Sequence, residues 1–310
     1  MPNIRRATIA DIPAIAPIFA DFQRTQSSRP DVFDTTPLTT AKIAEIIGSE
    51  DEEFYVLTSE SGEAIGLIVF SLMPYRSHSA LFLSHICVLS AHRGQGHGKA
   101  LIEFLSSYAR EKNCTHVELC VGHFNPTARK FYAHLGFAEI SCVMEYILLE
   151  EQLAKPNNVR LATPSDLAGI LAVATSLDAP EGEYPNALNR PYFRKEDVLK
   201  SIIENQKQQN AVVATNQSGE IVAYMVIQVE ETTNVRFRVD AKYAAVCFAC
   251  LLPTADIGKV ADALFDYARH YAATGGCPRM EIDLLSSNTM AREFLRNRGM
   301  TECYYLMRLK

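Results

Sequence analysis

The chain has 310 residues, of which 48% are hydrophobic and 21% are charged, and its formal net charge is −6 at pH 7. This length is about twice that of a usual domain, so two domains are expected, each with enough apolar residues for a core. The acidic balance and the lack of Lys/Arg runs argue against nucleic-acid and membrane-surface partners. No apolar stretch approaches the ~20 residues that cross a bilayer.

Cysteine and histidine usage points to a reducing compartment and to no metal. The eight cysteines are scattered, and Cys87, Cys120 and Cys247 lie inside apolar runs, as reduced core thiols do. The C-x-x-C spacing of Cys247 and Cys250 has no second pair that would complete a zinc site, and the histidine spacings match no metal pattern. The start of the chain also lacks the continuous apolar segment of a secretory signal. We therefore expect a cytoplasmic protein.

Apolar periodicity predicts strands in the middle of the first half and helices around them. In chain order the predicted elements are a strand at 3–8, helices at 11–24 and 38–48, strands at 53–59, 63–73 and 79–89, a helix at 98–112, a strand at 115–121, a helix at 126–135 and a strand at 138–149. This order predicts an α/β protein of the α+β type, with a mixed, mostly antiparallel sheet flanked by helices.

The second half of the chain repeats the first. "IRRATIADIPAIAPI" (4–18) resembles "VRLATPSDLAGILAV" (159–173), and both continue from Thr through an Asp three residues later into a helical pattern. The turn "SESGEAIG" likewise resembles "NQSGEIVA", and "NPTARKFYAHLGF" (125–137) resembles "NTMAREFLRNRGM" (288–300). Three matches in the same order predict two copies of one fold. The copies are residues 1–150 and 159–310, joined by the polar, proline-containing linker 151–158.

The segment "SAHRGQGHGKALIEFL" (90–105) places Gly94, Gly96 and Gly98 between a predicted strand and a predicted helix. Free backbone N–H groups meet the positive end of the helix dipole at such a turn, which makes an anion site that a phosphate can approach closely. Arg93 adds a charged donor suited to phosphate.

Several kinds of glycine turn compete for this segment. A Walker loop fails, because Lys99 is followed by alanine and position 93 is arginine. A dinucleotide fingerprint needs G-x-G-x-x-G rather than G-x-G-x-G, and although Glu118 lies at the distance of a ribose-binding acid, the unit follows hairpin strands. A turn without a ligand leaves Arg93 and the glycines without a joint purpose.

The remaining pattern, Arg-x-x-Gly-x-Gly from Arg93 to Gly98, resembles the diphosphate-binding turn of the GNAT superfamily of coenzyme A-dependent N-acetyltransferases. "NPTARKFYAHLGF" strengthens the resemblance, because an Asn, a Phe-Tyr pair and a Leu-Gly-Phe ending recur there in the family. "RPDVFDTTP" (29–37) resembles the acceptor-side loop of small-molecule members. The resemblance covers the order of elements across residues 1–150.

This resemblance implies a role for each matching residue. The backbone of Ile86, Cys87 and Val88 would pair with the pantetheine arm like an added strand. Asn125 would hold the pantetheine, and Tyr132 would stand near the thioester sulfur as the acid that protonates the departing thiolate. The diphosphate would be wrapped by Arg93, Gly94, Gln95, Gly96, His97, Gly98 and Lys99.

The general base is open between two residues. Family members often carry a carboxylate on the strand before the glycine turn, whereas this chain has Ser84 and His85 there. A histidine has an unperturbed pKa of ~6.5 and would serve near neutral pH. Glu118, on the neighbouring predicted strand, is the other candidate, and a structural role for either residue is the plainer alternative.

The second copy departs from the motif. Its equivalent turn, "LLPTADIGKVADALF", has the single glycine Gly258, and Leu295 stands where the first copy has Tyr132, although Asn288 matches Asn125. We expect a degenerate domain that stabilises the first copy or, through its loop 179–193, walls the acceptor cleft. A monomer with pseudo-dimeric halves and a homodimer are both compatible with the sequence.

The sequence therefore predicts an N-acyltransferase that moves an acetyl group from acetyl-CoA to a primary amine of a small molecule or peptide, with its active site in the first copy. One alternative is a non-catalytic acyl-CoA-binding sensor or interaction protein on the same fold. Another is an enzyme that uses a longer or charged acyl group.

Overall fold

The computed structural model describes residues 3–26, 38–74, 78–148, 154–176, 195–206, 209–232, 241–253 and 256–309. The predicted acceptor-side loop 29–37, the loop 179–193 and the first part of the linker lie outside the described residues. No helix within the described ranges is long and apolar enough to cross a membrane.

The chain forms two compact units, and each contains the last strand of the other half of the sequence. The first unit comprises the described residues of Met1–Ser141 and Cys303–Lys310, and the second those of Cys142–Thr233 and Asp240–Glu302. The units therefore differ from the halves 1–150 and 159–310 at their final strands.

The first unit is a six-stranded sheet in the order β1-β2-β3-β4-β5-β12. Neighbouring strands are antiparallel except β4 and β5, which are parallel. The strands are β1 (Asn3–Arg6), β2 (Glu52–Thr58), β3 (Ala64–Pro74), β4 (Ser79–Val88), β5 (His116–Gly122) and β12 (Thr301–Leu309). This arrangement confirms the predicted mixed, mostly antiparallel sheet.

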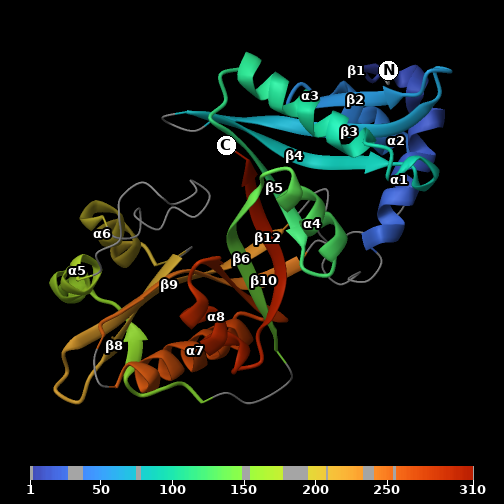
Figure 1. Ribbon diagram of the computed structural model, residues 1–310. Coiled ribbons are helices and arrows are strands. Elements are labelled where there is room, and N and C mark those ends of the chain that lie inside the picture. Colours follow the sequence, from blue (N-terminus) through green and yellow to red (C-terminus); the bar gives the residue numbers. More distant parts are fainter. Residues whose placement is uncertain are drawn as a thin grey trace. The chain divides into compact units, whose positions relative to one another are not determined.

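Helices cover both faces of this sheet (Figure 1). The helices α1 (Ile12–Gln26) and α2 (Thr40–Gly48) pack Ile15, Phe19 and Ile43 against Val56 and Val69 of the strands in one core. On the other face, α3 (His97–Glu111) packs Phe104 and Tyr108 against Tyr55 and Phe70, with the rings inclined to one another. The fourth helix, α4 (Pro126–His134), follows β5.

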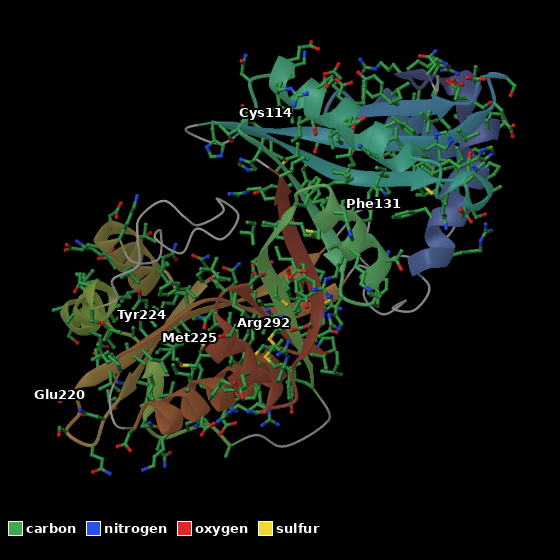
Figure 2. The ribbon with its side chains drawn as sticks, viewed as in Figure 1. Cys114, Phe131, Glu220, Tyr224, Met225 and Arg292 are labelled. Carbon is green, nitrogen blue, oxygen red and sulfur yellow. The ribbon has the colours of Figure 1, made fainter. Side chains whose placement is uncertain are left out.

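The second unit repeats this topology in the order β6-β11-β10-β9-β8-β7, with β10 and β11 parallel. Tyr224 and Met225 of β9 lie in its core (Figure 2). Its strands are β6 (Ala138–Ile147), β7 (Val159–Leu161), β8 (Gln209–Thr215), β9 (Ile221–Thr232), β10 (Ala241–Leu251) and β11 (Arg279–Leu285). Its helices are α5 (Leu167–Thr175), α6 (Glu196–Glu204), α7 (Ile257–Thr274) and α8 (Thr289–Arg296).

Local contacts confirm the internal repeat. The Asp11 carboxylate accepts a hydrogen bond from the Thr8 N–H at 2.8 Å, and the Asp166 carboxylate accepts one from the Thr163 N–H at 2.7 Å. Each carboxylate also pairs with the arginine of the repeated segment, Arg5 or Arg160. The arginine and the N–H donors hold the pKa of both carboxyl groups well below the usual range.

Candidate active site

The parallel strands β4 and β5 separate toward their carboxyl ends. Their paired residues run from Ala80 and His116 to Leu83 and Leu119. A bulge in the β3–β4 ladder falls at Ser84, so beyond this point β4 follows β3 while β5 follows β12. The backbone that faces the gap between β4 and β5 can therefore accept an extended ligand as an added strand.

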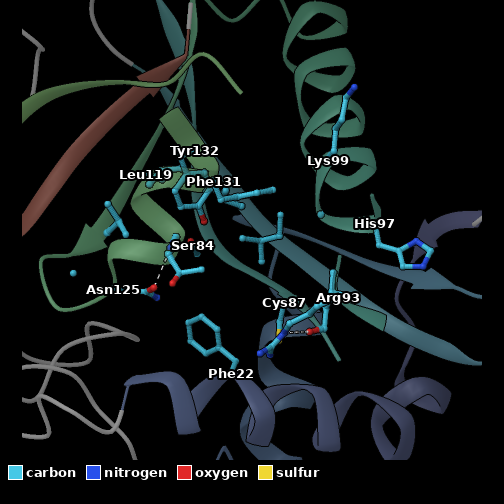
Figure 3. A pocket seen from close by; sticks show the side chains of 18 of the residues that line it. Phe22, Ser84, Cys87, Arg93, His97, Lys99, Leu119, Asn125, Phe131 and Tyr132 are labelled. Atoms are coloured by element: carbon cyan, nitrogen blue, oxygen red, sulfur yellow. Dashed lines mark hydrogen bonds between the residues drawn. The ribbon is translucent and has the colours of Figure 1, made fainter. Parts of the chain in front are cut away.

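A cavity of about 700 Å³ occupies this opening. Its apolar wall includes Phe22 of α1, Phe82 of β4 and Phe131 of α4. Ser84, Asn125 and Tyr132 gather at one end, and Arg93 and His97 lie at the other (Figure 3). Of the predicted donor-binding residues, the lining includes Ile86, Cys87, Val88, Arg93, Gly94, Gly96, His97, Gly98, Lys99 and Asn125. Gln95 is not part of the lining; its side-chain amide donates to the Ala91 carbonyl oxygen at 3.3 Å.

Two of the three glycines are required by the backbone of the turn. Gly94 and Gly96 have φ of 77° and 85°, in the left-handed region that favours glycine. Gly96 is the residue before the first turn of α3, where the N–H groups have no acceptor within the helix. These donors, together with the helix dipole, make the turn an anion site at the end of the cavity.

The third glycine, Gly98, is required by side-chain packing rather than by its backbone conformation. A Cβ atom on Gly98 would lie 3.1 Å from Cζ of Phe131, so this glycine permits close packing between α3 and α4. Because Phe131 also lines the cavity, Gly98 acts on the site by fixing one of its walls.

Arg93 is held by protein groups as well as facing the cavity. Its Nε donates to the Val88 carbonyl oxygen at 2.8 Å, and its Nη2 donates to the Asp21 carboxylate of α1. Asp21 is buried and also accepts from Arg24 at 2.7 Å. The guanidinium thus ties the glycine turn to the end of β4 and to α1. Sequence reasoning missed Asp21 because it is 72 positions from Arg93 and resembles any polar residue of an amphipathic helix.

Asn125 caps the helix that carries the predicted acid. Its side-chain oxygen accepts from the Ala128 N–H at 3.0 Å, which fixes the start of α4, and Pro126 occupies the first helical position. Asn125 also lines the cavity, and its side-chain NH2 group can still donate a hydrogen bond.

Tyr132 lies at the end of the cavity away from the glycine turn (Figure 3). Its side chain lines the cavity, and its ring packs against Phe131 and Phe137 at centroid distances of 5.3 and 5.4 Å. Burial raises the pKa of Tyr132, so the hydroxyl stays protonated at ordinary pH and can act as a donor.

His85 lies on the other face of β4, outside the cavity lining, so the structure does not support it as the base. Its ring packs between Phe19 and Phe22, each at a centroid distance of 5.5 Å. Burial lowers the pKa of His85 to about 4. The bulge at Ser84 shifts the alternation of the strand, and Ser84 takes the cavity side instead.

Glu118 is likewise placed in a structural ion pair rather than in the cavity lining. Its carboxylate is 3% exposed and accepts from Nε of Arg308 at 3.1 Å, while Nε2 of His116 lies 3.2 Å away. Because this carboxylate is held by an arginine in the core and does not line the cavity, the structure does not support Glu118 as the base.

We expect His85→Phe to leave kcat/KM within about threefold and to make the fold less sensitive to acid. In the second unit, the residue directly after the equivalent bulge at Cys247 is Phe248. Phenylalanine therefore already occupies the position that corresponds to His85, and we choose it as the substitution. The folded-state pKa of about 4 lies below the ordinary value of 6.5, so the unfolded state takes up the proton first as the pH falls. His85 therefore costs up to about 3 kcal/mol of stability between pH 6.5 and 4, and nothing above that range. Urea denaturation of both proteins at pH 7.5 and pH 5 measures this difference. A large loss of kcat/KM at pH 7.5 would restore His85 to the mechanism.

The equivalent place in the second unit keeps the scaffold and loses the chemical groups. Asn288 accepts from the Ala291 N–H at 3.1 Å, as Asn125 does from Ala128. Leu295 is buried at the position of Tyr132 and provides no proton. The turn before α7 carries no glycine, and its Thr254 and Ala255 lie outside the described residues.

Comparison with known proteins finds a family match within the first unit. Residues 16–137 match the model of the family described as "Acetyltransferase (GNAT) family". An uncharacterized N-acetyltransferase, YhfO, of Bacillus subtilis is 26% identical over 150 residues, which cover 47% of this chain and 96% of that protein. Thialysine N-epsilon-acetyltransferase of Bos taurus is 28% identical over 119 residues, which cover 37% of this chain and 65% of that protein.

Solved structures also match the fold across both units. A GCN5-related N-acetyltransferase from Sphaerobacter thermophilus has a TM-score of 0.54 at 17% sequence identity, with 99% of this chain and 95% of that chain covered. At this identity the match establishes the fold alone, and it extends beyond the segment that the family model covers.

Proposed function

Because the chain belongs to the GNAT superfamily of acetyltransferases, we propose that its first unit transfers an acetyl group from acetyl-CoA to a primary amine of a small molecule or peptide. The observation that carries this proposal is that the glycine turn and Tyr132 line one and the same cavity. An anion site at one end and a protonated hydroxyl at the other match a diphosphate-containing thioester and its leaving group.

The donor would lie along the opened edge of β4. The N–H groups of Gly94 to Lys99 and the start of α3 would bind the diphosphate. The backbone of Ile86 to Val88 would pair with the pantetheine arm, and the Asn125 amide would hold the arm from the side of α4. This placement brings the thioester toward Ser84 and Tyr132.

Transfer forms a bond between the amine nitrogen and the acetyl carbon, and breaks the carbon–sulfur bond. An N–H group of the separated β4 segment would stabilise the developing oxyanion. The ammonium acceptor would first lose one proton to solvent, which frees the lone pair for attack. Tyr132 would then give its proton to the departing thiolate, and the second proton that the nitrogen loses would restore the tyrosine hydroxyl. Without His85 and Glu118, the proposal assigns no side chain as base.

A thiol-release assay with a panel of primary amines tests the function. The expected result is acceptor-dependent release of coenzyme A with an equal amount of acetylated amine. Tight binding of coenzyme A without turnover on any amine would favour the alternative of an acyl-CoA sensor. Comparison of acetyl-CoA with longer and charged acyl-CoA donors in the same assay identifies the acyl group.

Gly96→Ala is expected to weaken coenzyme A binding about tenfold. A Cβ at Gly96 meets no atom within 4 Å, so the cost is the left-handed backbone alone, roughly 1–2 kcal/mol. The free turn would relieve this strain by leaving the conformation that aims its N–H groups at the diphosphate, and binding would have to restore that conformation. Isothermal titration of the full chain with coenzyme A measures the effect.

The matched control is Gly258→Ala, the same substitution near the start of α7. Gly258 also has open space around its Cβ, but it sits in a helix without a positive φ, so alanine costs nothing there. Equal weakening by both substitutions would mean that the diphosphate is not bound at the first turn.

A further inference from the structure

The last strand of the chain supports the turn that carries Asn125. Strand β12 pairs with β5 over six residues, from Tyr304 opposite Gly122 to Leu309 opposite Val117. It thus belongs to the first unit, although by sequence it ends the degenerate half. The end of β5 leads directly into residues 122–125, which connect the strand to α4.

Contacts to β12 continue beyond the strand into this turn. The His123 N–H donates to the Cys303 carbonyl oxygen at 2.9 Å, and Nδ1 of His123 lies 3.2 Å from the Tyr305 hydroxyl. One turn into α4, the Arg129 guanidinium stacks on the Tyr305 ring, 3.8 Å from its centroid. One buried tyrosine therefore contacts both the turn and the helix that follows it.

The turn itself is tightly folded. A Cβ on Gly122 would lie 2.2 Å from Cε1 of Phe124, and the Asn125 N–H donates back to the Gly122 carbonyl oxygen at 3.0 Å. The close approach of Phe124 and this backbone hydrogen bond both restrict the conformation of the turn. His123 and Arg129 are the residues through which β12 holds it.

The position of Asn125 depends on this support because its amide lies within the same turn. Arg129 is held a second time, by the Glu139 carboxylate at 2.6 Å, so α4 is fixed between Glu139 and Tyr305. Gly122, Asn125 and Tyr132 all line the cavity. Gly122 and Asn125 belong to the turn that His123 ties to β12, and Tyr132 lies on α4, which Arg129 holds.

We propose that Tyr305 is a positioning residue for donor binding, and that the degenerate half thereby supplies a necessary part of the active unit. Tyr305 touches no substrate; it acts through His123 and Arg129 on Asn125 and α4. The inference rests on the proposed function, because it assumes that the donor occupies the cavity. It gives the second half a role that its lost glycines and its Leu295 leave open.

The test compares Tyr305→Leu, which removes the ring and the hydroxyl, with Tyr305→Phe, which keeps the ring under Arg129. We expect Tyr305→Leu to raise the Kd of coenzyme A and the KM of acetyl-CoA about tenfold, with the KM of the amine within twofold. Tyr305→Phe should raise the Kd about two- to threefold. Calorimetry and steady-state kinetics on the full chain give these values.

A double-substitution cycle separates positioning from general loss of stability. Arg129→Met removes the stacked guanidinium without touching the cavity lining, so adding Tyr305→Leu to it should raise the Kd by no more than about threefold further. If Tyr305→Leu does not fold, the Kd values of coenzyme A for Tyr305→Phe and Arg129→Met test the positioning role instead.

Two failures are distinguishable. If the unaltered chain binds no coenzyme A, the proposed function is wrong. If the unaltered chain binds it, and Tyr305→Leu and Tyr305→Phe bind it equally well, the donor site stands and the positioning role of Tyr305 is refuted.

Discussion

Tyr132→Phe is expected to lower kcat about 100-fold while the KM of acetyl-CoA changes less than threefold. The substitution removes one oxygen atom from a side chain that is packed on Phe131 and Phe137, so the shape of the cavity is kept. What is lost is the proton for the departing thiolate, and general acid catalysis contributes about 10²–10⁴ in rate. Steady-state kinetics with a good amine acceptor measures both constants.

The pH profile gives a second readout for Tyr132. Burial raises its pKa above the ordinary value, so the unaltered enzyme should not lose activity through Tyr132 deprotonation below about pH 10. Tyr108→Phe is the matched control, because Tyr108 of α3 packs on Phe70 outside the cavity and its loss of a hydroxyl should leave kcat unchanged. A kcat for Tyr132→Phe within threefold of the unaltered enzyme would remove the tyrosine from the chemistry.

Arg308→Met is expected to lower the free energy of unfolding by about 3 kcal/mol at neutral pH. Arg308 of β12 is the cation that pairs with Glu118 in the core of the first unit, and the two side chains are 12% and 3% exposed. Removal of one partner leaves a buried charge uncompensated, which costs about 3–5 kcal/mol. Urea denaturation of the full chain, followed by circular dichroism, measures the change.

The double variant Glu118→Gln/Arg308→Met should recover at least half of this loss, because no charge then remains uncompensated. Lys42→Met provides the surface control: Lys42 pairs with Glu45 at 2.9 Å, but both side chains are well exposed, so its loss should cost less than about 1 kcal/mol. If Arg308→Met were no more destabilising than Lys42→Met, the ion pair would not hold β12 in the first unit.

Much of the scaffold could be predicted from local patterns. The repeated Arg, Thr and Asp of the helix starts, such as Arg5, Thr8 and Asp11, specify the same contacts in both halves. The turns at Gly62 and Gly219 both have the left-handed φ that their glycines indicate. The glycine turn before α3 could be predicted for the same reason, because Gly94 and Gly96 lie where the backbone has a left-handed conformation.

The exchange of final strands could not be predicted from the sequence. Residues 138–147 and 301–309 both have strand patterns, and the pattern alone does not say which parallel pair each segment joins. The choice is made by long-range contacts, such as Arg308 with Glu118, which are 190 positions apart. The side of β4 on which His85 lies could not be predicted either, because nothing in a continuous apolar run marks the bulge at Ser84.

The three glycines also differ in a way that sequence spacing hides. Gly96 is required by its left-handed backbone conformation, whereas Gly98 is required because Phe131 approaches it from another helix. Arg93 of the motif resembles Gly98 in this respect, because its partner Asp21 lies far away in the sequence, on α1. Residues that act through neighbours distant in the chain carry no local signal, whereas residues that act through their own backbone do.

A crystal structure of the full chain with coenzyme A tests the central claim most directly. We predict one coenzyme A per chain, with its diphosphate on the N–H groups that begin α3 and its sulfur beside the Tyr132 hydroxyl. Coenzyme A bound in the second unit, or bound in the first with its sulfur turned away from Tyr132, would contradict the account.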